Sequence, residues 1–220
     1  MIPADATCWT LIHAAAAGDR AARDVFARLY EPIARAYFAA RWRETPGAAI
    51  DDAVQDVFVE CFKPDGVLDR VVADQPDGFR AFFHGVLKNI ARRREAGRGV
   101  EGLSGADPAA DETSLSRAFD RAWAQSLLQE AARLQVEAAA TQGDRAVRRV
   151  ELLRLRFQGG LPVREIADRW GEDPAKVHHE YATARAEFKA ALGRVMAFHR
   201  PAASAAEIDA ACRELLGLLA

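Results

Sequence analysis

Residues Ile50 to Phe62 read IDDAVQDVFVECF, and the spacing of the apolar side chains predicts a helix with one buried face. The residues expected on that face are Ile50, Val54, Val57, Phe58 and Cys61. The opposite face carries Asp52, Asp56 and Glu60 at intervals of four, with Val59 exposed among them. Like charges at this spacing destabilise an isolated helix by about 0.2–0.5 kcal/mol per pair, and the next basic residue is Lys63.

This acidic face has two interpretations. It is either an ordinary solvated face, in which Asp51 and Asp52 are stabilised by the positive end of the helix dipole, or a docking surface for a basic partner. In the second interpretation, Val59 supplies an apolar contact at the centre of the surface. The rest of the chain is needed to choose between them.

The charges of the neighbouring segments are strongly separated, although the 220-residue chain has a formal net charge of only −2. Residues 51–77 contain eight acidic residues and two basic ones, whereas residues 79–98 contain six basic residues and one acidic residue. Opposite charge in adjacent segments predicts two partners of opposite charge.

Composition predicts an all-α protein, because Ala, Arg and Leu are abundant and alternating β-branched patterns are rare. The three cysteines, Cys8, Cys61 and Cys212, form no CxxC pair, which argues against a disulfide framework or a zinc site and favours a reducing cytoplasm. No apolar run is long enough for a membrane span, and the N-terminal stretch lacks the basic region of a signal peptide. We therefore expect a cytoplasmic protein with no membrane segment, metal or cofactor.

A second informative helix is predicted for residues Phe79 to Arg94, FRAFFHGVLKNIARRR. Its core face is expected to contain Phe79, Phe82, Phe83, Val86 and Ile90. Another face repeats cationic or ionisable residues every four positions: Arg80, His84, Lys88 and Arg92. Such a stripe beside aromatic residues binds phosphates and stacks on unpaired bases, or it is simply a solvated face. The continuation of the basic run through Arg93, Arg94 and Arg98 favours nucleic acid.

The chain is predicted to have two helical domains. A first domain covers residues 1–98, and residues 99–117, rich in Gly, Ala, Ser and Asp, form an acidic flexible linker. Residues 118–198 form the second domain, which begins with a long helix from Phe119 to Ala140. Within it, VREIADRW, a stop at Gly171 and an N-cap at Asp173 have the layout of a helix-turn-helix.

A C-terminal extension, residues 199–220, is predicted to contain a further amphipathic helix. Ser204 and Glu207 form a capping box, and apolar residues recur after it at helical spacing. Because one face of this helix is apolar, it must dock, either on the rest of the chain or on a separate partner.

Four stretches, taken in order, resemble the extracytoplasmic-function (ECF) group of bacterial RNA polymerase sigma factors. They are GDRAARDVFARLY, DDAVQDVF, FRAFFHGVLKNIARRR and VELLRLRFQGGLPVREIADRWGEDPAKV. The first resembles the first conserved region of that family, and the second resembles its core-polymerase-binding helix. The third resembles its promoter-melting helix, and the fourth its C-terminal helix-turn-helix. The resemblance extends over roughly residues 11–196.

The resemblance implies a protein that binds core RNA polymerase and directs promoter-specific initiation. The acidic helix would dock on a coiled coil of the polymerase clamp through Asp51, Asp52, Asp56, Val59 and Glu60. The basic helix would contact the minus-ten promoter element through Arg80, His84, Lys88, Asn89, Arg92 and Arg93. The helix-turn-helix would read the minus-thirty-five element through Arg164, Lys176, His178 and His179.

The recognition helix departs from the family pattern, since Glu180 and Thr183 stand where the family usually carries Arg or Lys. This departure keeps open a helical adaptor that does not bind DNA. A second alternative is a helix-turn-helix regulator that binds DNA without core polymerase, which explains the C-terminal half but leaves the acidic and basic helices without a role. An enzyme is disfavoured: HExxH would need His at Thr183, and there is no glycine-rich phosphate loop. We expect no catalytic residue. Apart from polymerase and promoter DNA, a separate anti-sigma protein is a further candidate partner.

Overall fold

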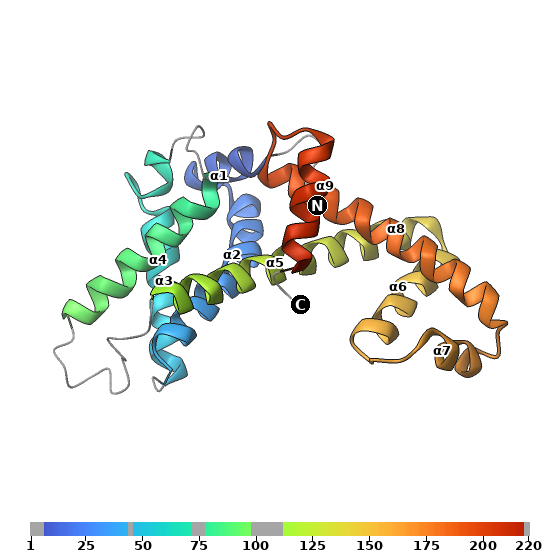
Figure 1. Cartoon of the computed structure of the whole chain (residues 1–220). Coiled ribbons are helices and arrows are strands. Elements are labelled where there is room, and N and C mark those ends of the chain that lie inside the picture. Colours follow the sequence, from blue (N-terminus) through green and yellow to red (C-terminus); the bar gives the residue numbers. More distant parts are fainter. Residues whose placement is uncertain (1–6, 44–45, 72–77, 98–111, 218–220) are drawn as a thin grey trace. The chain divides into compact units, whose positions relative to one another are not determined.

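The computed structural model describes residues 7–43, 46–71, 78–97 and 112–217. Within these residues the regular secondary structure is entirely helical, which confirms the all-α prediction (Figure 1). The elements in chain order are α1 (Cys8–Ala16), α2 (Arg20–Arg41), α3 (Gly47–Phe62), the 3-10 helix η1 (Leu68–Arg70), α4 (Gly78–Gly97), α5 (Glu112–Gln142), α6 (Asp144–Phe157), α7 (Val163–Trp170), α8 (Pro174–His199) and α9 (Ala205–Gly217).

The chain divides into two compact units whose limits differ from the predicted domains. The first unit comprises Met1–Ser126 together with Ala197–Ala220, and the second comprises Leu127–Met196. The start of the predicted second domain, residues 118–126, therefore belongs to the first unit, as does the C-terminal extension. The second unit is an insertion in the chain of the first, joined to it at both ends.

Aromatic side chains from three parts of the sequence form the core of the first unit. Tyr30 of α2 lies at the centre, with its ring centroid 4.9 Å from that of Phe79 and 5.3 Å from that of Phe83, both on α4. Trp123 of α5 stacks on the other side of Tyr30 at 5.8 Å. Aromatic pairs at these separations add to the stability gained from burial, so α5 is an integral part of this core.

Helix α5 begins earlier than the sequence predicts. It starts at Glu112 rather than near Phe119, so residues 112–117 are helical and the prediction of a flexible linker is wrong for them. Leu115 is 3% exposed and Phe119 is 1% exposed, which shows that the apolar repeat of the helix begins one turn before Phe119. Packing of Leu115 against the first unit offsets the entropy of ordering this turn. The other residues of the predicted linker, 99–111, lie outside the described residues.

The second unit has its own small core between α6, α7 and α8. Its fully or nearly buried members are Leu152, Val163, Ile166, Ala167 and Val177. Helix α7 ends at Gly171, which has a left-handed backbone with φ of 63°. The next helix, α8, begins after Asp173, whose side chain accepts a hydrogen bond from the backbone N–H of Ala175. The predicted order of helix, glycine turn and capped helix is present.

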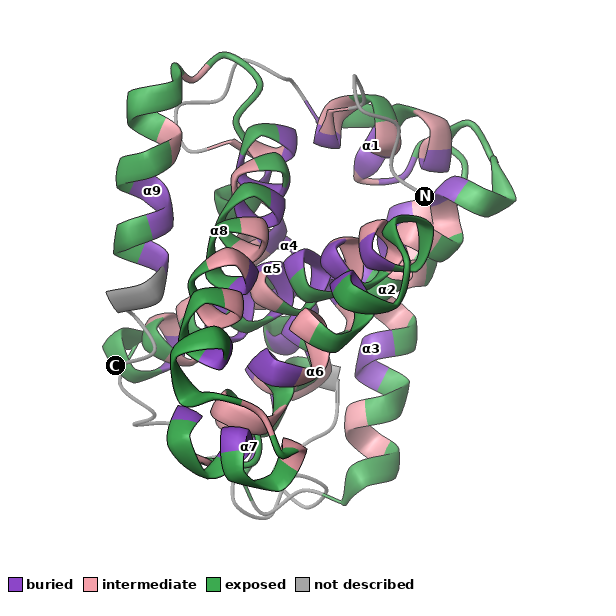
Figure 2. Cartoon of the chain, turned by 90° about the vertical axis from the view of Figure 1, so that its right-hand side faces the viewer, coloured by how far each residue is buried: buried purple, intermediate pink, exposed green. Residues whose placement is uncertain are grey.

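Helix α9 packs within the first unit and buries its apolar face there. Its capping box is formed, with the Glu207 carboxylate accepting from the backbone N–H of Ser204 at 2.7 Å. Ala211, Cys212 and Leu215 are each about 5% exposed or less, and Figure 2 shows buried positions along α9. Of the two docking alternatives, the structure supports the intramolecular one.

Candidate functional site

The acidic face of α3 is partly neutralised by the basic end of α4. Arg94 donates through Nε to Asp56 Oδ2 at 2.6 Å, and Arg93 donates to Glu60 Oε2 at 3.1 Å. Lys63 and Arg93 together hold the pKa of Glu60 below its ordinary value. Lys63 is the next basic residue along the chain, but α4 packs beside α3 and supplies two further cations to this face.

The opposite charges of the two segments are thus in part directed at each other rather than at two outside partners. Asp51 is also engaged, since it accepts a hydrogen bond from Arg35 of α2. Asp52 remains exposed, and Val59 is 57% exposed. Of the five residues predicted to bind polymerase, Asp51, Asp52 and Val59 are exposed, and of these Asp51 is paired with Arg35.

Three side chains on the basic face of α4 contact the start of α5. Lys88 Nζ lies 2.6 Å from Glu112 Oε2, and Arg80 forms an ion pair with Asp120. Glu112 has a lowered pKa chiefly because it accepts this hydrogen bond from Lys88. Two of the predicted phosphate-binding cations are therefore paired with carboxylates of the same unit.

His84, which lies between Arg80 and Lys88 on this face, stacks on Phe119 of α5. The ring centroids are 4.4 Å apart and the planes differ by 16°, while Tyr37 meets the imidazole edge-on from α2. Burial, with a contribution from the nearby Lys88 charge, lowers the pKa of His84. The His84 ring therefore stacks as a neutral aromatic ring at neutral pH, and the ring stacked on it is that of Phe119.

The remaining predicted DNA-binding residues of α4 have different surroundings. Asn89 and Arg92 are exposed, whereas Arg93 is paired with Glu60 as described. The far end of the helix is anchored by Glu95, whose carboxylate accepts from Arg41 at 2.6 Å and from the Trp42 indole at 3.0 Å. The structure therefore brings the six predicted residues onto one helix but leaves only part of them open.

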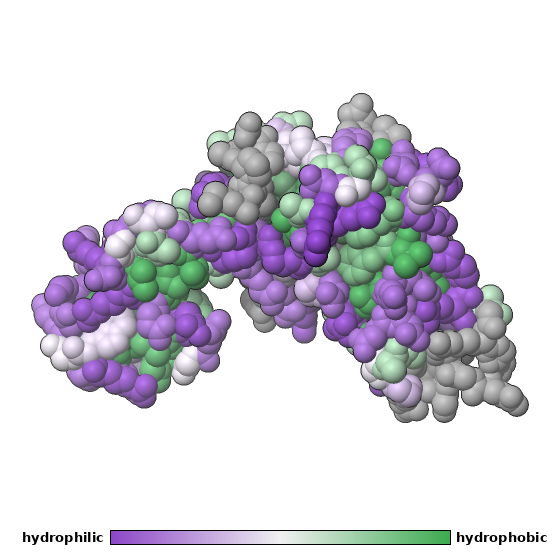
Figure 3. Space-filling model, turned by 180° about the vertical axis from the view of Figure 1, so that it is seen from behind, coloured by the Kyte–Doolittle hydropathy of each residue, from purple (hydrophilic) through white to green (hydrophobic). Residues whose placement is uncertain are grey.

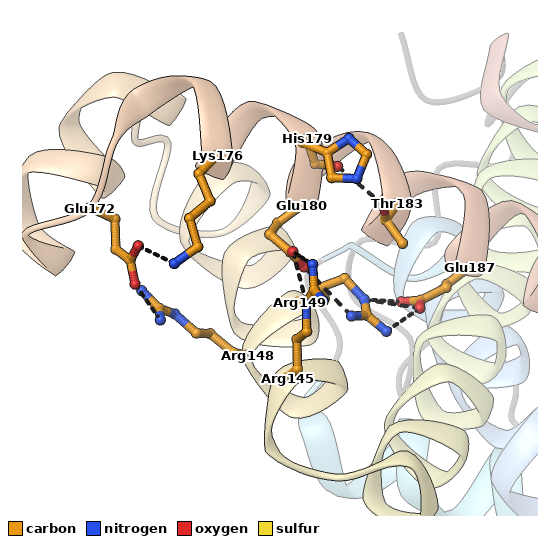
Figure 4. A network of polar contacts seen from close by, with 9 residues as sticks. All are labelled: Arg145, Arg148, Arg149, Glu172, Lys176, His179, Glu180, Thr183 and Glu187. Atoms are coloured by element: carbon orange, nitrogen blue, oxygen red, sulfur yellow. Dashed lines mark hydrogen bonds and ion pairs between the residues drawn. The ribbon is translucent and has the colours of Figure 1, made fainter.

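On the second unit, the predicted contact residues lie at the start of α8 and on α7. Arg164, His178 and His179 are exposed. Lys176 forms an ion pair with Glu172 at 2.6 Å, and Arg148 of α6 donates to the same carboxylate at 2.9 Å (Figure 4). These hydrogen bonds, Lys176 first, lower the pKa of Glu172.

Glu180, the residue that departs from the family pattern, has a structural partner. Arg145 of α6 donates through Nε to Glu180 Oε1 at 2.9 Å, and Arg149 lies 3.5 Å from its other oxygen. Arg149 also binds Glu187, two turns further along α8 (Figure 4). The carboxylate at position 180 therefore fastens α8 to α6 instead of facing a ligand.

Sequence reasoning missed the arginines of α6. A signal was present, because positions 145, 148 and 149 are three and four residues apart and so lie on one helical face. With Trp170, Glu172, Lys176 and Glu180, these arginines line a shallow hollow of the second unit. The guanidinium of Arg148 lies over the Trp170 ring, 4.4 Å from its centroid.

Exposed apolar side chains are few on the described surface. The large ones are Val59, Val136, Val147 and Phe157, and Figure 3 shows hydrophobic areas interrupted by hydrophilic residues on the face that it displays. In the described part of the chain, no group of His, Cys, Asp and Glu side chains is arranged to hold a metal ion. None of the described helices is both long and apolar enough to cross a membrane.

Comparison of the chain with models of protein families, with curated proteins and with solved structures finds no match.

Proposed function

We propose that this protein is an ECF-type sigma factor, which binds core RNA polymerase in the cytoplasm and directs it to particular promoters. The observation that carries the proposal is the surface of α3 centred on Val59. This apolar side chain is 57% exposed on the same helix as the exposed carboxylate of Asp52, so the acidic surface contains an apolar group. A small apolar contact ringed by charge is the usual composition of a protein interface.

Two further features support the proposal. The acidic α3, the basic aromatic α4 and the helix–turn–helix of α7 and α8 follow one another in the order of the family. Arg92 and Asn89 on α4, and Arg164, His178 and His179 on the second unit, are available to DNA. In this mechanism the protein recruits and positions, and performs no covalent chemistry.

The test is capture of purified core RNA polymerase by the full-length protein. Because Asp56 is paired with Arg94, the informative variant is Asp52→Ala with Val59→Ala, which changes two exposed side chains and leaves the ion pairs of α3 intact. We expect polymerase binding at least tenfold weaker than for the wild type, as for residues at the centre of an interface. A matched control, Asp24→Ala with Val136→Ala, alters an exposed Asp and an exposed Val elsewhere.

Equal polymerase binding by the α3 variant and the control would refute the assignment of α3. The alternative function, a helix-turn-helix regulator acting without core polymerase, is favoured by one observation: the acidic face of α3 is partly neutralised within the chain by Arg35, Arg93 and Arg94. Under that alternative, the wild type binds duplex DNA by itself and fails to bind polymerase.

A further inference from the structure

The first four turns of α5, Glu112–Ser126, contact the basic face of α4 at three positions, and the two segments run in opposite directions through these contacts. Lys88 of α4 forms an ion pair with Glu112. Four residues before Lys88 on α4, His84 stacks on Phe119. Four residues before His84, Arg80 forms an ion pair with Asp120. Two cationic side chains and one aromatic side chain in this half of the α4 face therefore each contact one side chain of α5. We refer to residues 112–126 as the covering segment.

The covering segment presents to α4 the same kinds of group as a nucleic-acid strand does, namely negative charges and a stacking ring. Its two carboxylates are eight residues apart, which places them about 12 Å apart along the helix axis, and each neutralises a cation as a phosphate would. Between them Phe119 stacks on the His84 ring at 4.4 Å, which is the contact that an unpaired base makes with an aromatic platform.

The covering segment is held firmly rather than resting on the surface. Leu115, Phe119 and Trp123 are at most 7% exposed. Ser126 donates its hydroxyl hydrogen to the backbone carbonyl of Leu29 at 2.5 Å. On the C-terminal side of the chain, the His199 ring meets Trp123 with centroids 5.4 Å apart. A strand that binds the same face must displace these contacts.

We propose that the covering segment occupies the single-strand binding surface of α4 as an internal substitute for nucleic acid, and that the segment must leave before a strand can bind to Arg80, His84 and Lys88. This inference rests on the proposed function for the identity of the ligand. The observed affinity for a strand is then reduced in proportion to the fraction of molecules in which the surface is open.

The test measures binding of a fluorescein-labelled 12-nucleotide single-stranded DNA to the full-length protein across a salt series. The variant is Glu112→Ala with Asp120→Ala, which frees Lys88 and Arg80. The control is Asp24→Ala with Glu214→Ala, which changes the net charge equally at two exposed positions elsewhere in the first unit. Thermal melting verifies the fold, and Glu112→Gln with Asp120→Asn replaces the first variant if that variant does not fold.

We expect the variant to bind the oligonucleotide about tenfold more tightly than the control at 0.1 M salt, because two freed cations steepen the salt dependence by roughly 1.4 in the log–log slope. A second measurement is amide hydrogen exchange of residues 112–126 in the wild type, which should become faster when the oligonucleotide saturates the protein. Affinity and slope equal to those of the control, or unchanged exchange, would overturn the proposal.

Polymerase binding, measured on the same wild type and variant, distinguishes failure of this inference from failure of the proposed function. If the oligonucleotide results are as expected but neither wild type nor variant binds core polymerase, the covering role stands and the sigma-factor proposal fails. Suppose instead that the protein binds polymerase, but the substitutions do not change oligonucleotide affinity and the oligonucleotide does not change hydrogen exchange of residues 112–126. The sigma-factor proposal then stands and the covering role fails.

Discussion

Asp56 illustrates how one residue can belong to an apparent docking surface and to the fold at the same time. Its position on α3 places it beside Asp52 on the acidic face, yet its carboxylate binds Arg94, whose side chain is only 16% exposed. Removal of Asp56 therefore leaves a largely buried guanidinium without this acceptor, whereas removal of Asp52 changes a solvated carboxylate. The two residues, equivalent in sequence spacing, are not equivalent in the folded protein.

We predict that Asp56→Ala lowers the free energy of unfolding by about 1–2 kcal/mol, the usual cost of leaving a buried polar group unsatisfied. Asp52→Ala should change it by less than about 0.5 kcal/mol, as is typical of a surface substitution. Urea denaturation at neutral pH measures both. Equal stability of the two variants would mean that the Arg94 contact contributes nothing to the fold.

The carboxylate of Glu180 gives a pH dependence whose sign follows from its partner. The hydrogen bond from Arg145, with a further contribution from Arg149, lowers the pKa of Glu180 in the folded state. Because the pKa of Glu180 is lower in the folded than in the unfolded state, its charge stabilises the fold. This stabilisation is complete above the unfolded-state pKa near 4.5 and is lost as the pH falls through the folded-state pKa.

Glu180→Gln should accordingly destabilise the second unit at pH 7 and progressively less as the pH is lowered below 4.5. Urea midpoints measured between pH 7 and the acid limit of folding test this. Glu165→Gln, which alters an exposed i,i+4 pair with Arg169 on α7, serves as the comparison. A loss of stability that is independent of pH would show that the charge of Glu180 is not its contribution.

At the scale of elements, α9 is a structural part of the first unit. It buries Ala211, Cys212 and Leu215 on one side and is preceded by a formed capping box. Its exposed side carries Arg213 and Glu214. The helix therefore contributes to the fold through its apolar stripe and not through its charges.

Truncation after Arg200 should lower the melting temperature of the first unit. Loss of the three buried side chains removes about 3 kcal/mol of burial, which for a chain of this size corresponds to roughly 5–10 °C. Arg213→Ala with Glu214→Ala, on the exposed face, should leave the melting temperature nearly unchanged. An unaltered melting temperature after truncation would mean that the stripe serves an outside partner.

At the scale of the whole molecule, the first unit is built from two distant parts of the chain. Phe119 and Trp123 of α5 complete the aromatic core around Tyr30 and His84, and Cys8 of α1 contacts the backbone carbonyl of His199 near the end of α8. A boundary drawn at residue 98 removes the covering segment and the C-terminal part together.

We predict that stability follows the order full-length chain, fragment 1–126, fragment 1–98. The shorter fragment loses the packing of Phe119 and Trp123, and both fragments lose α9. Circular dichroism melts of the three chains, with binding of a hydrophobic dye as a measure of exposed apolar surface, give the order. Equal melting temperatures for the two fragments would contradict an integral role of α5 in this core.

Local sequence determined the helices and their ends, because those depend on side chains within a turn of one another. The cap at Asp19, the left-handed stop at Gly171 and the capping box at Ser204 all lie where their residue types predict. The exposed position of Val59 on α3 was likewise predictable from helical spacing. These features need no knowledge of the distant chain.

Only the tertiary structure decided which charges are available. The pairs Arg94–Asp56 and Lys88–Glu112 join residues 38 and 24 positions apart, so no periodicity within one helix reveals them. The partner of a charged side chain is set by how helices pack, and packing brings opposite charges together because burial makes an uncompensated charge costly. The sequence by itself therefore determined an acidic helix, a basic helix and the helix, glycine turn and capped helix of the second unit, while the fold decided that α5 contacts Arg80, His84 and Lys88 of the basic face.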